Sequence, residues 1–285
     1  MTKVTEQGGV NHQVALLEKY GLVSPDAVVP LPSKGIIYKL YDDGSALSEL
    51  QIRAMTVKEM DILANRMYIE DLTFIRRVLS SCIIPPDKGW PPKQSTADII
   101  RELVNGDLET LLLALRTVTY GTTYTFEQPC EAPRCDNSLV GEIDLSQFET
   151  KELQESPLEL GTNQFVVQDN KIFNNAEVII SLATVRISEE LHAEQQQREA
   201  RRFDQKGRIH ARLEKAVVRI GEEKSRGDIT FLLSKLGADG VERLQELLEE
   251  KLDFGPVLES SGHKCSKCSR VQDIHVPLAQ AVFFR

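Results

Sequence analysis

The stretches Cys130-Glu-Ala-Pro-Arg-Cys135 and Cys265-Ser-Lys-Cys268 decide the fold of this chain. Each cysteine pair is followed at the same distance by a similar apolar segment, and the first pair also follows a strand-like segment, 122–126. Strand, cysteine turn and strand is the order of a zinc ribbon. A tetrahedral zinc site needs four ligands, and one tight turn supplies two thiolates. We therefore predict one structural zinc ion held by the four cysteines: Cys130, Cys135, Cys265 and Cys268.

Other interpretations of the cysteines stay open at this point. They could be thiols without a metal, or His263 could replace one of them as a ligand. They could also form a redox pair, although a redox CxxC motif opens a helix after a strand. Cys268 is instead followed by Ser269-Arg-Val-Gln-Asp, which begins a strand-like segment. Because 129 residues separate Cys135 from Cys265, a shared site must tie together distant parts of the chain.

Similar segments recur outward from the cysteines at a nearly constant separation. Cys135 and Cys268 are 133 residues apart, and Leu145 and Leu278 are also 133 apart. Upstream, the segment 50–56 lies 132 residues before 182–188. Self-similarity at a fixed offset indicates repeated architecture, with chance selection of the matching segments as the alternative. The predicted fold is α+β, with two tandem, duplicated, helix-rich halves, each ending in a β-hairpin with a cysteine turn.

This duplication sets the predicted organisation of the chain. An N-terminal arm covers 1–27, a first half 28–150 and a second half 151–285, the last with a charged helical arm over 188–227. Thr56 and Glu59 have capping-box spacing at the start of a helix. Expected helices cover 14–20, 57–66, 72–83, 98–104, 107–120, 228–236 and 241–252, and expected strands cover 49–55, 122–126, 140–145, 165–167 and 177–182. A tight turn is expected at Asn105-Gly106, and the apolar tail, 274–278 and 281–284, should be buried in the protein or in a partner.

Composition excludes several classes of protein. Among 285 residues, 41% are hydrophobic and 27% charged, as in ordinary globular proteins. No apolar run approaches the roughly 20 residues that span a bilayer, and the polar start, 1–10, lacks the apolar core of a signal peptide. A net charge of −9 argues against general nucleic-acid binding. The chain is therefore expected to fold in a reducing cytoplasm, where cysteine pairs more often hold metal than form disulfides.

Two further patterns bear on function. The segment 198–226 holds ten cations and five acidic residues, which suits either a surface that attracts an acidic neighbour or a solvated helix with internal ion pairs. The catalytic motifs GxxxxGK[ST], GxSxG, HExxH and GxGxxG do not occur. An enzyme would need unrecognised chemistry, so we expect no catalytic residues.

An ordered set of motifs resembles one protein family. The set consists of Leu31-Pro-Ser-Lys-Gly-Ile-Ile-Tyr38, Ile52-Arg-Ala-Met-Thr-Val-Lys-Glu59, Gly106-Asp107, Leu115-Arg116, Tyr120-Gly121-x2-Tyr124 and a cysteine pair, followed at the C-terminus by the second pair, Pro277-Leu278 and Phe283-Phe284. It resembles the baseplate hub and hub-assembly proteins of contractile-tailed bacteriophages over 28–148 and, more loosely, over the last thirty residues.

The resemblance implies a role and a place. It implies a non-enzymatic virion or tail-assembly protein, put together in the host cytoplasm, that joins the baseplate hub to its wedges or nucleates their assembly. Partners would be other baseplate and tail proteins, and a homo-oligomer within the baseplate is compatible with the resemblance. The resemblance implies no contact with a membrane and no direct contact with nucleic acid. The alternative is a cytoplasmic zinc-ribbon adaptor or nucleic-acid-associated factor, because zinc ribbons often occur in such proteins.

Overall fold

The computed structural model describes residues 19–20, 25–70, 73–200 and 208–278. The first half contains β1 (Asp26–Pro30), β2 (Glu49–Arg53), α2 (Val57–Ala64), α3 (Arg66–Glu70), α4 (Phe74–Cys82), β3 (Ile83–Ile84), α5 (Thr96–Glu102), α6 (Asn105–Tyr120), β4 (Thr123–Pro129), β5 (Ser138–Asp144), the 3-10 helix η1 (Leu145–Gln147) and β6 (Thr150–Lys151). The second half contains β7 (Gln164–Val167), η2 (Phe173–Asn175), β8 (Val178–Ser181), α7 (Val185–Ala200), α8 (Arg208–Ala216), β9 (Val217–Ile220), α9 (Arg226–Lys235), α10 (Ala238–Lys251), β10 (Gly255–Pro256), β11 (Glu259–Lys264) and β12 (Val271–His275). The predicted mixture of helices and small sheets is confirmed.

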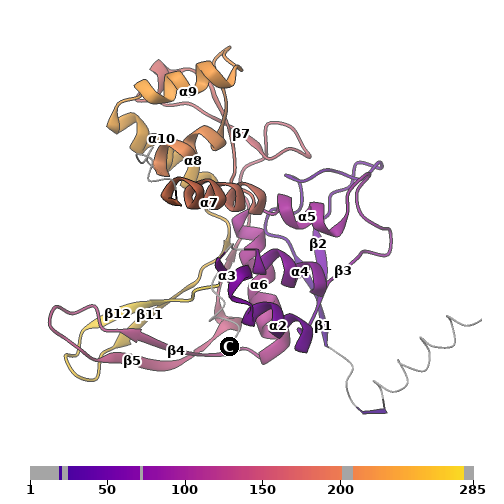
Figure 1. The fold of residues 1–285 in the computed structure, drawn as a ribbon, viewed down its shortest axis with the longest axis vertical. Coiled ribbons are helices and arrows are strands. Elements are labelled where there is room, and N and C mark those ends of the chain that lie inside the picture. The colour runs from indigo at the N-terminus through magenta and orange to yellow at the C-terminus, as the bar shows by residue number, and fades with distance from the viewer. Residues whose placement is uncertain (1–18, 21–24, 71–72, 201–207, 279–285) are drawn as a thin grey trace, which may run out of the picture.

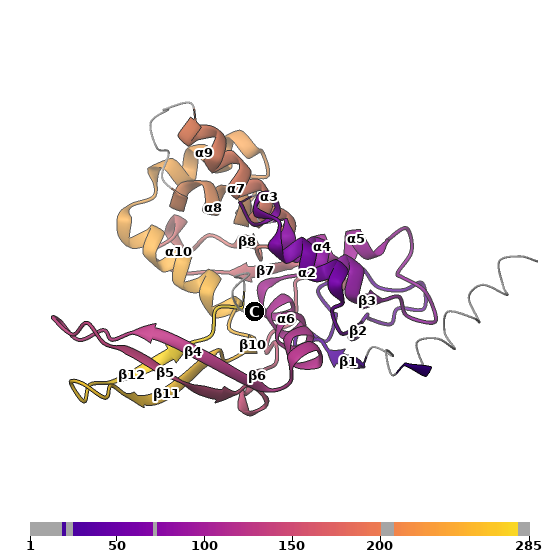
Figure 2. The same ribbon diagram turned by 60° about the horizontal axis from the view of Figure 1, so that its bottom comes forward.

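The same order of elements occurs in both halves. Each half has a three-stranded antiparallel sheet, β1-β2-β3 or β7-β8-β9, with helices between its strands and after them, and then a two-stranded hairpin. In Figures 1 and 2, α7 lies between the first half and the other helices of the second half, and the first half's helices lie beside its sheet. The hairpins β4–β5 and β11–β12 project together from the molecule. The hairpins therefore meet although they come from different halves.

The junction between the second strand and the helix that follows it is similar in the two halves. Thr56 precedes α2, and its main chain and hydroxyl form a capping box with Glu59. Thr184 precedes α7, and its hydroxyl accepts from the amide of Ile187 at 3.4 Å. The pairs Thr56-Val57 and Thr184-Val185 thus occupy equivalent places, 128 residues apart. The segments 50–56 and 182–188, which the sequence pattern matched, differ in structure, because β8 ends at Ser181 and 185–188 is already helical.

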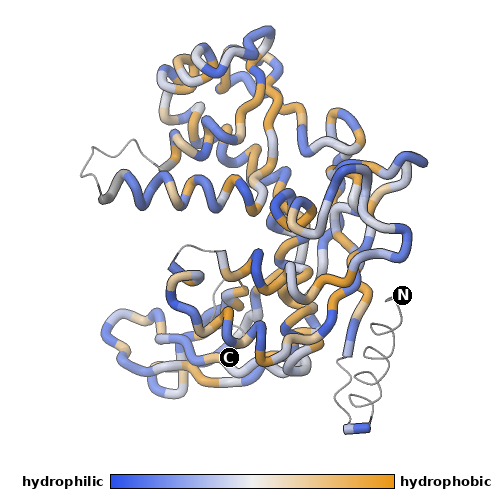
Figure 3. Tube along the Cα trace, turned by 45° about the vertical axis from the view of Figure 1, so that its right-hand side comes forward, coloured by the Kyte–Doolittle hydropathy of each residue, from blue (hydrophilic) through white to orange (hydrophobic). Residues whose placement is uncertain are grey.

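Helix α6 is the central element of the first half. Its core face consists of Leu108, Leu111, Leu112 and Leu115, all buried, at the spacing expected for one side of a helix. It ends at Gly121, whose φ of 86° is a conformation that glycine adopts readily. In the second half the strands β8 and β9 are buried at Val178, Ile180 and Val217, and Figure 3 shows hydrophobic stretches in both parts of the chain. The buried apolar residues of the two halves belong to one continuous core.

Several local predictions need correction. The turn expected at Asn105-Gly106 is the first turn of α6, and a methyl group on Gly106 would lie 2.3 Å from the carbonyl oxygen of Phe254. The charged segment 188–227 contains helix, but also strand β9. The sequence did not reveal β1, β3 and β9, because Pro30 and the short lengths hide their pairing with β2 and β8. Trp90 packs against the core. The helix expected at 14–20 and the tail 281–284 lie, in all but residues 19–20, outside the described residues.

Candidate metal centre

The four cysteine sulfurs lie together. All ligand atoms of Cys130, Cys135, Cys265 and Cys268 are within 4.8 Å of one another. The Sγ atoms of Cys130 and Cys268 are 3.5 Å apart, and those of Cys135 and Cys265 are 3.9 Å apart. Four sulfurs at about 2.3 Å from a zinc ion would form a tetrahedron with edges of about 3.8 Å. The spacing thus fits a tetrahedral thiolate site.

Two hairpins carry the cysteine turns. In the first, β4 pairs with β5 from Thr123 opposite Asp144 to Pro129 opposite Ser138. In the second, β11 pairs with β12 from Glu259 to Lys264, with a register shift between Ser260 and His263. Each turn is closed by a backbone hydrogen bond, from Cys135 to Ala132 and from Ser269 to Cys265. The strands before and after each pair therefore hold its sulfurs at the end of a ladder.

Side chains between the hairpins hold the two turns together. The buried Gln272 of β12 accepts from the amide of Glu131 at 2.9 Å and donates to the carbonyl of Pro129 at 3.2 Å. The rings of Phe126 and His263 meet edge to face, with centroids 5.0 Å apart. His263 also bonds the Ser260 hydroxyl at 2.8 Å. It belongs to this packing and lies outside the group of four potential ligands found among the described residues.

Hydrogen-bond donors surround the sulfur of Cys265. The amide group of Asn137 reaches its sulfur at 3.4 Å and the Ser266 hydroxyl at 3.2 Å. Backbone N–H groups of Cys268 and Lys267, together with Asn137, lower the pKa of Cys265 to about 6. A thiolate is the metal-binding form of cysteine, so the donors around Cys265 favour the form that a metal ion binds. The Lys267 ammonium pairs with Asp136.

The sequence predicted the four cysteines, and the structure brings all four together. Sequence reasoning missed Gln272 and Asn137, the side chains that connect one turn to the other. Their partners lie 141 and 128 residues away, so local pattern carries no signal for them. The only hint was that Gln272 is a polar residue on the inward side of an alternating strand.

One comparison with known proteins identifies the family. A family model described as T4 bacteriophage base plate protein matches residues 31–284. The chain belongs to this family. The resemblance predicted from the motifs is thereby confirmed, and membership supports a structural role in a phage baseplate, among other tail proteins of the virion. Searches of curated proteins and of solved structures gave no match.

Within this baseplate family member, the motif 31–38 closes over the start of α6. The carboxylate of Asp107 accepts hydrogen bonds from the Ser33 amide at 2.9 Å, the Ser33 hydroxyl and the Tyr38 hydroxyl at 2.6 Å. Burial raises the pKa of Asp107 above its ordinary value although these bonds oppose the shift. Gly35 has a φ of 70°, and a methyl group there would meet the Leu47 carbonyl oxygen at 2.1 Å. These motif residues therefore have a structural role, which is to fix the segment 31–38 against the start of α6.

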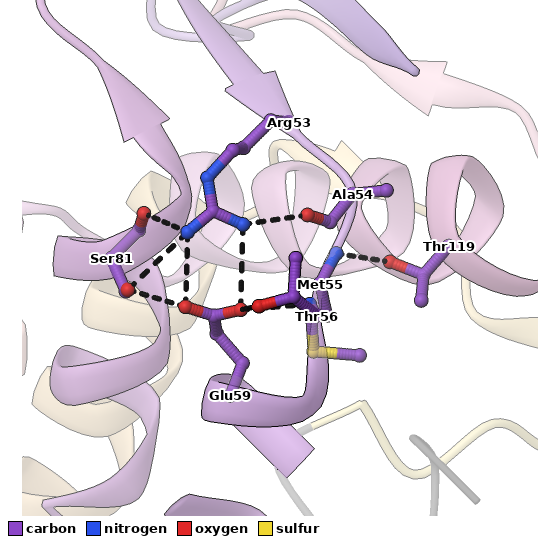
Figure 4. Close-up of polar contacts among 7 residues, drawn as sticks. All are labelled: Arg53, Ala54, Met55, Thr56, Glu59, Ser81 and Thr119. Atoms are coloured by element: carbon purple, nitrogen blue, oxygen red, sulfur yellow. Dashed lines mark hydrogen bonds and ion pairs between the residues drawn. The ribbon is translucent and has the colours of Figure 1, made fainter. Parts of the chain in front are cut away.

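The second motif, 52–59, builds an ion pair between the buried Glu59 and the partly exposed Arg53 (Figure 4). Glu59 at the start of α2 accepts from Arg53 of β2 at 3.0 Å and from Ser81 of α4. Burial raises the pKa of Glu59, but hydrogen bonds from Arg53, Ser81 and Thr56 outweigh burial and lower it to about 2. The network joins a strand to two helices, so its charged residues also have a structural explanation.

The charged segment 188–227 uses much of its charge internally. Among its described cations, Lys215 pairs with Glu190 at 3.0 Å, and Arg219 pairs with Glu177. These ion pairs join α8 to α7 and β9 to the residue before β8, so neither of them lies within one helix, and part of the described positive charge is neutralised between elements. No helix in the described part of the baseplate protein has the length and apolar character to cross a membrane.

Proposed function

We propose that this protein is a non-enzymatic joint of the phage baseplate, in which one structural zinc ion bound by Cys130, Cys135, Cys265 and Cys268 locks two duplicated halves. As a rigid joint, it would connect hub and wedge components or nucleate their assembly. The observation that carries the proposal is the meeting of four sulfurs from two hairpins that belong to different halves. The ion would fix the hairpins relative to each other, since ligation energy contributes directly to folding.

The two halves also contact each other away from the cysteines, so the ion would stabilise only part of the junction between them. Strand β6 pairs with β10, and the start of α6 packs against Phe254 and Gly255. On the other side, the amide of Val185 donates to the carbonyl of Leu103 at 3.0 Å. These contacts lie near the helices, whereas the cysteine turns lie at the far ends of the hairpins. We therefore expect metal removal to loosen the hairpins while the two helical parts stay together.

The donor set supports a structural ion. Four cysteines complete a tetrahedron and leave no position for water or substrate, which is the usual difference between structural and catalytic zinc sites. The buried carboxylates Glu59 and Asp107 already accept hydrogen bonds from their own chain. This arrangement favours a joint over an enzyme.

Two measurements test the proposed function together. Elemental analysis of the purified full-length protein should find one zinc per chain, and Cys130→Ser and Cys268→Ser should each lower that content. In a phage whose own copy of the gene carries an amber codon, plasmid-borne Cys130→Ser should leave incomplete baseplates in electron micrographs, whereas the wild-type gene restores tails.

Cys82→Ala is the matched control, because Cys82 is a buried cysteine of α4 and not one of the four clustered thiols. It should keep full zinc content and support tail assembly. Unchanged melting and full zinc content in both Cys130→Ser and Cys268→Ser would rule out the shared site. Normal tails from phage without any copy of the gene would rule out the role in assembly.

A further inference from the structure

The repeated order of elements gives two similar pairs of surfaces, each consisting of a turn between two helices and the start of another helix. One of these pairs forms a contact between the halves. The turn between α5 and α6, Leu103-Val104, lies on the start of α7. There the Val185 amide bonds the Leu103 carbonyl, Val104 forms a β-bridge with Thr184, and Arg186 pairs with Glu102 at 3.0 Å. By the repeated order of elements, the turn between α9 and α10 and the start of α2 form a second pair of the same kind.

The second turn has the backbone conformation of the first. Leu103 has φ and ψ of −57° and 133°, and Leu236 has −65° and 131°. The next residues also match, Val104 at −88° and 162° and Gly237 at −66° and 163°. In each turn the leucine amide donates to the carbonyl three residues before it at 3.3 Å. The turn 236–237 is therefore preformed for the contact that 103–104 makes.

The start of α2 is the uncovered counterpart of the start of α7. Val185 is 7% exposed because the first half covers it, whereas the equivalent Val57 is 72% exposed. Met60 follows one turn later on the same side of α2 and is also exposed. The network of Arg53, Glu59 and Ser81 holds this helix start rigidly (Figure 4). An apolar, rigid helix end is thus presented to a partner.

The face of α9 next to the second turn is apolar as well. Phe231 is 61% exposed and lies one helical turn before Lys235, whose ammonium is 5.7 Å from its ring centroid. Figure 1 places α9 and α2 at opposite ends of the molecule, so the two surfaces cannot meet within one copy. The complementary turn for α2 is therefore available on another copy of the same chain.

We infer that copies of this protein associate head to tail, with Phe231 and the turn Leu236-Gly237 of one copy on Val57 and Met60 of the next. Such a contact joins different surfaces and so continues into a ring or a filament. The inference rests on the repeated elements and not on the zinc site or the hub role.

One pair of like charges would weaken the association between copies. Where Glu102 attracts Arg186 inside the chain, Lys235 would face Lys58 between copies, since these residues are equivalent in the repeat. An exposed pair changes affinity by a factor of about two to five, so the like charges weaken the contact without abolishing it. The wild-type association should accordingly be weak and dependent on concentration.

Sedimentation velocity of the full-length protein over a range of concentrations tests the inference. The wild type should form dimers and larger species, and Val57→Glu or Phe231→Glu should each leave a monomer. A mixture of these two variants should form dimers only, since each variant keeps one intact surface. Val140→Glu is the control, because Val140 is 69% exposed on β5, away from both surfaces, and it should associate like the wild type.

Charge reversal separates a specific contact from general stickiness. Lys235→Glu should tighten association roughly fivefold, although it makes an acidic chain more acidic, and Lys224→Glu should not. A wild type that stays monomeric at about 1 mM, the weak end of measurable affinities, would overturn the inference. So would a mixture of Val57→Glu and Phe231→Glu that fails to dimerise.

Discussion

The two halves share an order of elements but anchor their long helices by different means. The first turn of α6 is fixed by a buried carboxylate, Asp107, with donors from Ser33 and Tyr38. The corresponding helix α10 is tied to the loop before η2 by an ion pair of Arg243 with Asp169 at 2.8 Å, in which both side chains are partly exposed. The same architecture can thus be held by a buried network or by a surface ion pair.

The difference extends to how the halves depend on each other. A buried polar group is costly unless its hydrogen bonds are complete, so the first half depends on the completeness of its own networks. The second half has Ile187 at the place of Glu59, and the start of α7 is instead covered by the first half. The start of α7 therefore depends on the first half for its burial, just as the start of α6 packs against Phe254 and Gly255 of the second half.

The largest effect is expected from Asp107→Ala. It would leave the Ser33 amide and the Tyr38 hydroxyl buried without an acceptor, at a cost of about 3 kcal/mol in the free energy of unfolding. Asp169→Ala, the matched change in the second half, should cost about 1 kcal/mol or less, because an ion pair that is partly exposed to water contributes little. Urea unfolding of both variants measures the difference, and equal losses would break the comparison.

A somewhat smaller effect concerns acid stability. The pKa of Glu59 is lowered to about 2 from an ordinary 4.5, so its stabilisation is present above pH 4.5 and is lost as the pH falls toward 2. A shift of this size contributes roughly 3 kcal/mol in full, of which about 2 kcal/mol should be lost between pH 6 and pH 3. Thermal unfolding between pH 3 and 6 should show a steeper decline in wild type than in Glu59→Gln. Parallel curves for the two proteins would show that Glu59 does not provide this stability.

The smallest effect on stability is expected between the hairpins. Gln272→Ala would leave the Glu131 amide and the Pro129 carbonyl without their partner, at a cost of about 1 to 2 kcal/mol. If the proposed zinc site is correct, zinc affinity should also fall roughly 10- to 100-fold, as for other residues that orient metal ligands. Competition with a zinc chelator measures this fall. Thr125→Ala, an exposed change on β4, is the control, and equal affinities would show that Gln272 does not position the ligands.

Sequence reasoning succeeded where the signal is local. The capping box of Thr56 and Glu59 needs only residues three apart, and the apolar spacing of α6 reflects a single helix face. The metal site could also be predicted from the cysteine pairs, because paired cysteines in a reducing compartment more often bind a metal ion than form a disulfide. The family resemblance similarly depended on the order of short motifs rather than on any long-range contact.

The remainder required contacts between distant residues. Strand β3 has two residues, and only its pairing with β2 makes it a strand. Arg53 meets Ser81 across 28 residues and Gln272 meets Glu131 across 141. The proposed repeat shows the same limit: the sequence pattern matched Leu50 with Leu182, whereas Leu50 lies in β2 and Leu182 follows the end of β8.

Zinc K-edge X-ray absorption of the full-length protein, with zinc content measured on the same sample, tests the central claim most directly. One ion shared by both hairpins predicts one zinc per chain surrounded by four sulfurs at about 2.3 Å. Two zinc ions per chain, each with two sulfurs and lighter atoms, would show that the hairpins bind metal separately. That result would contradict a joint made by a single ion.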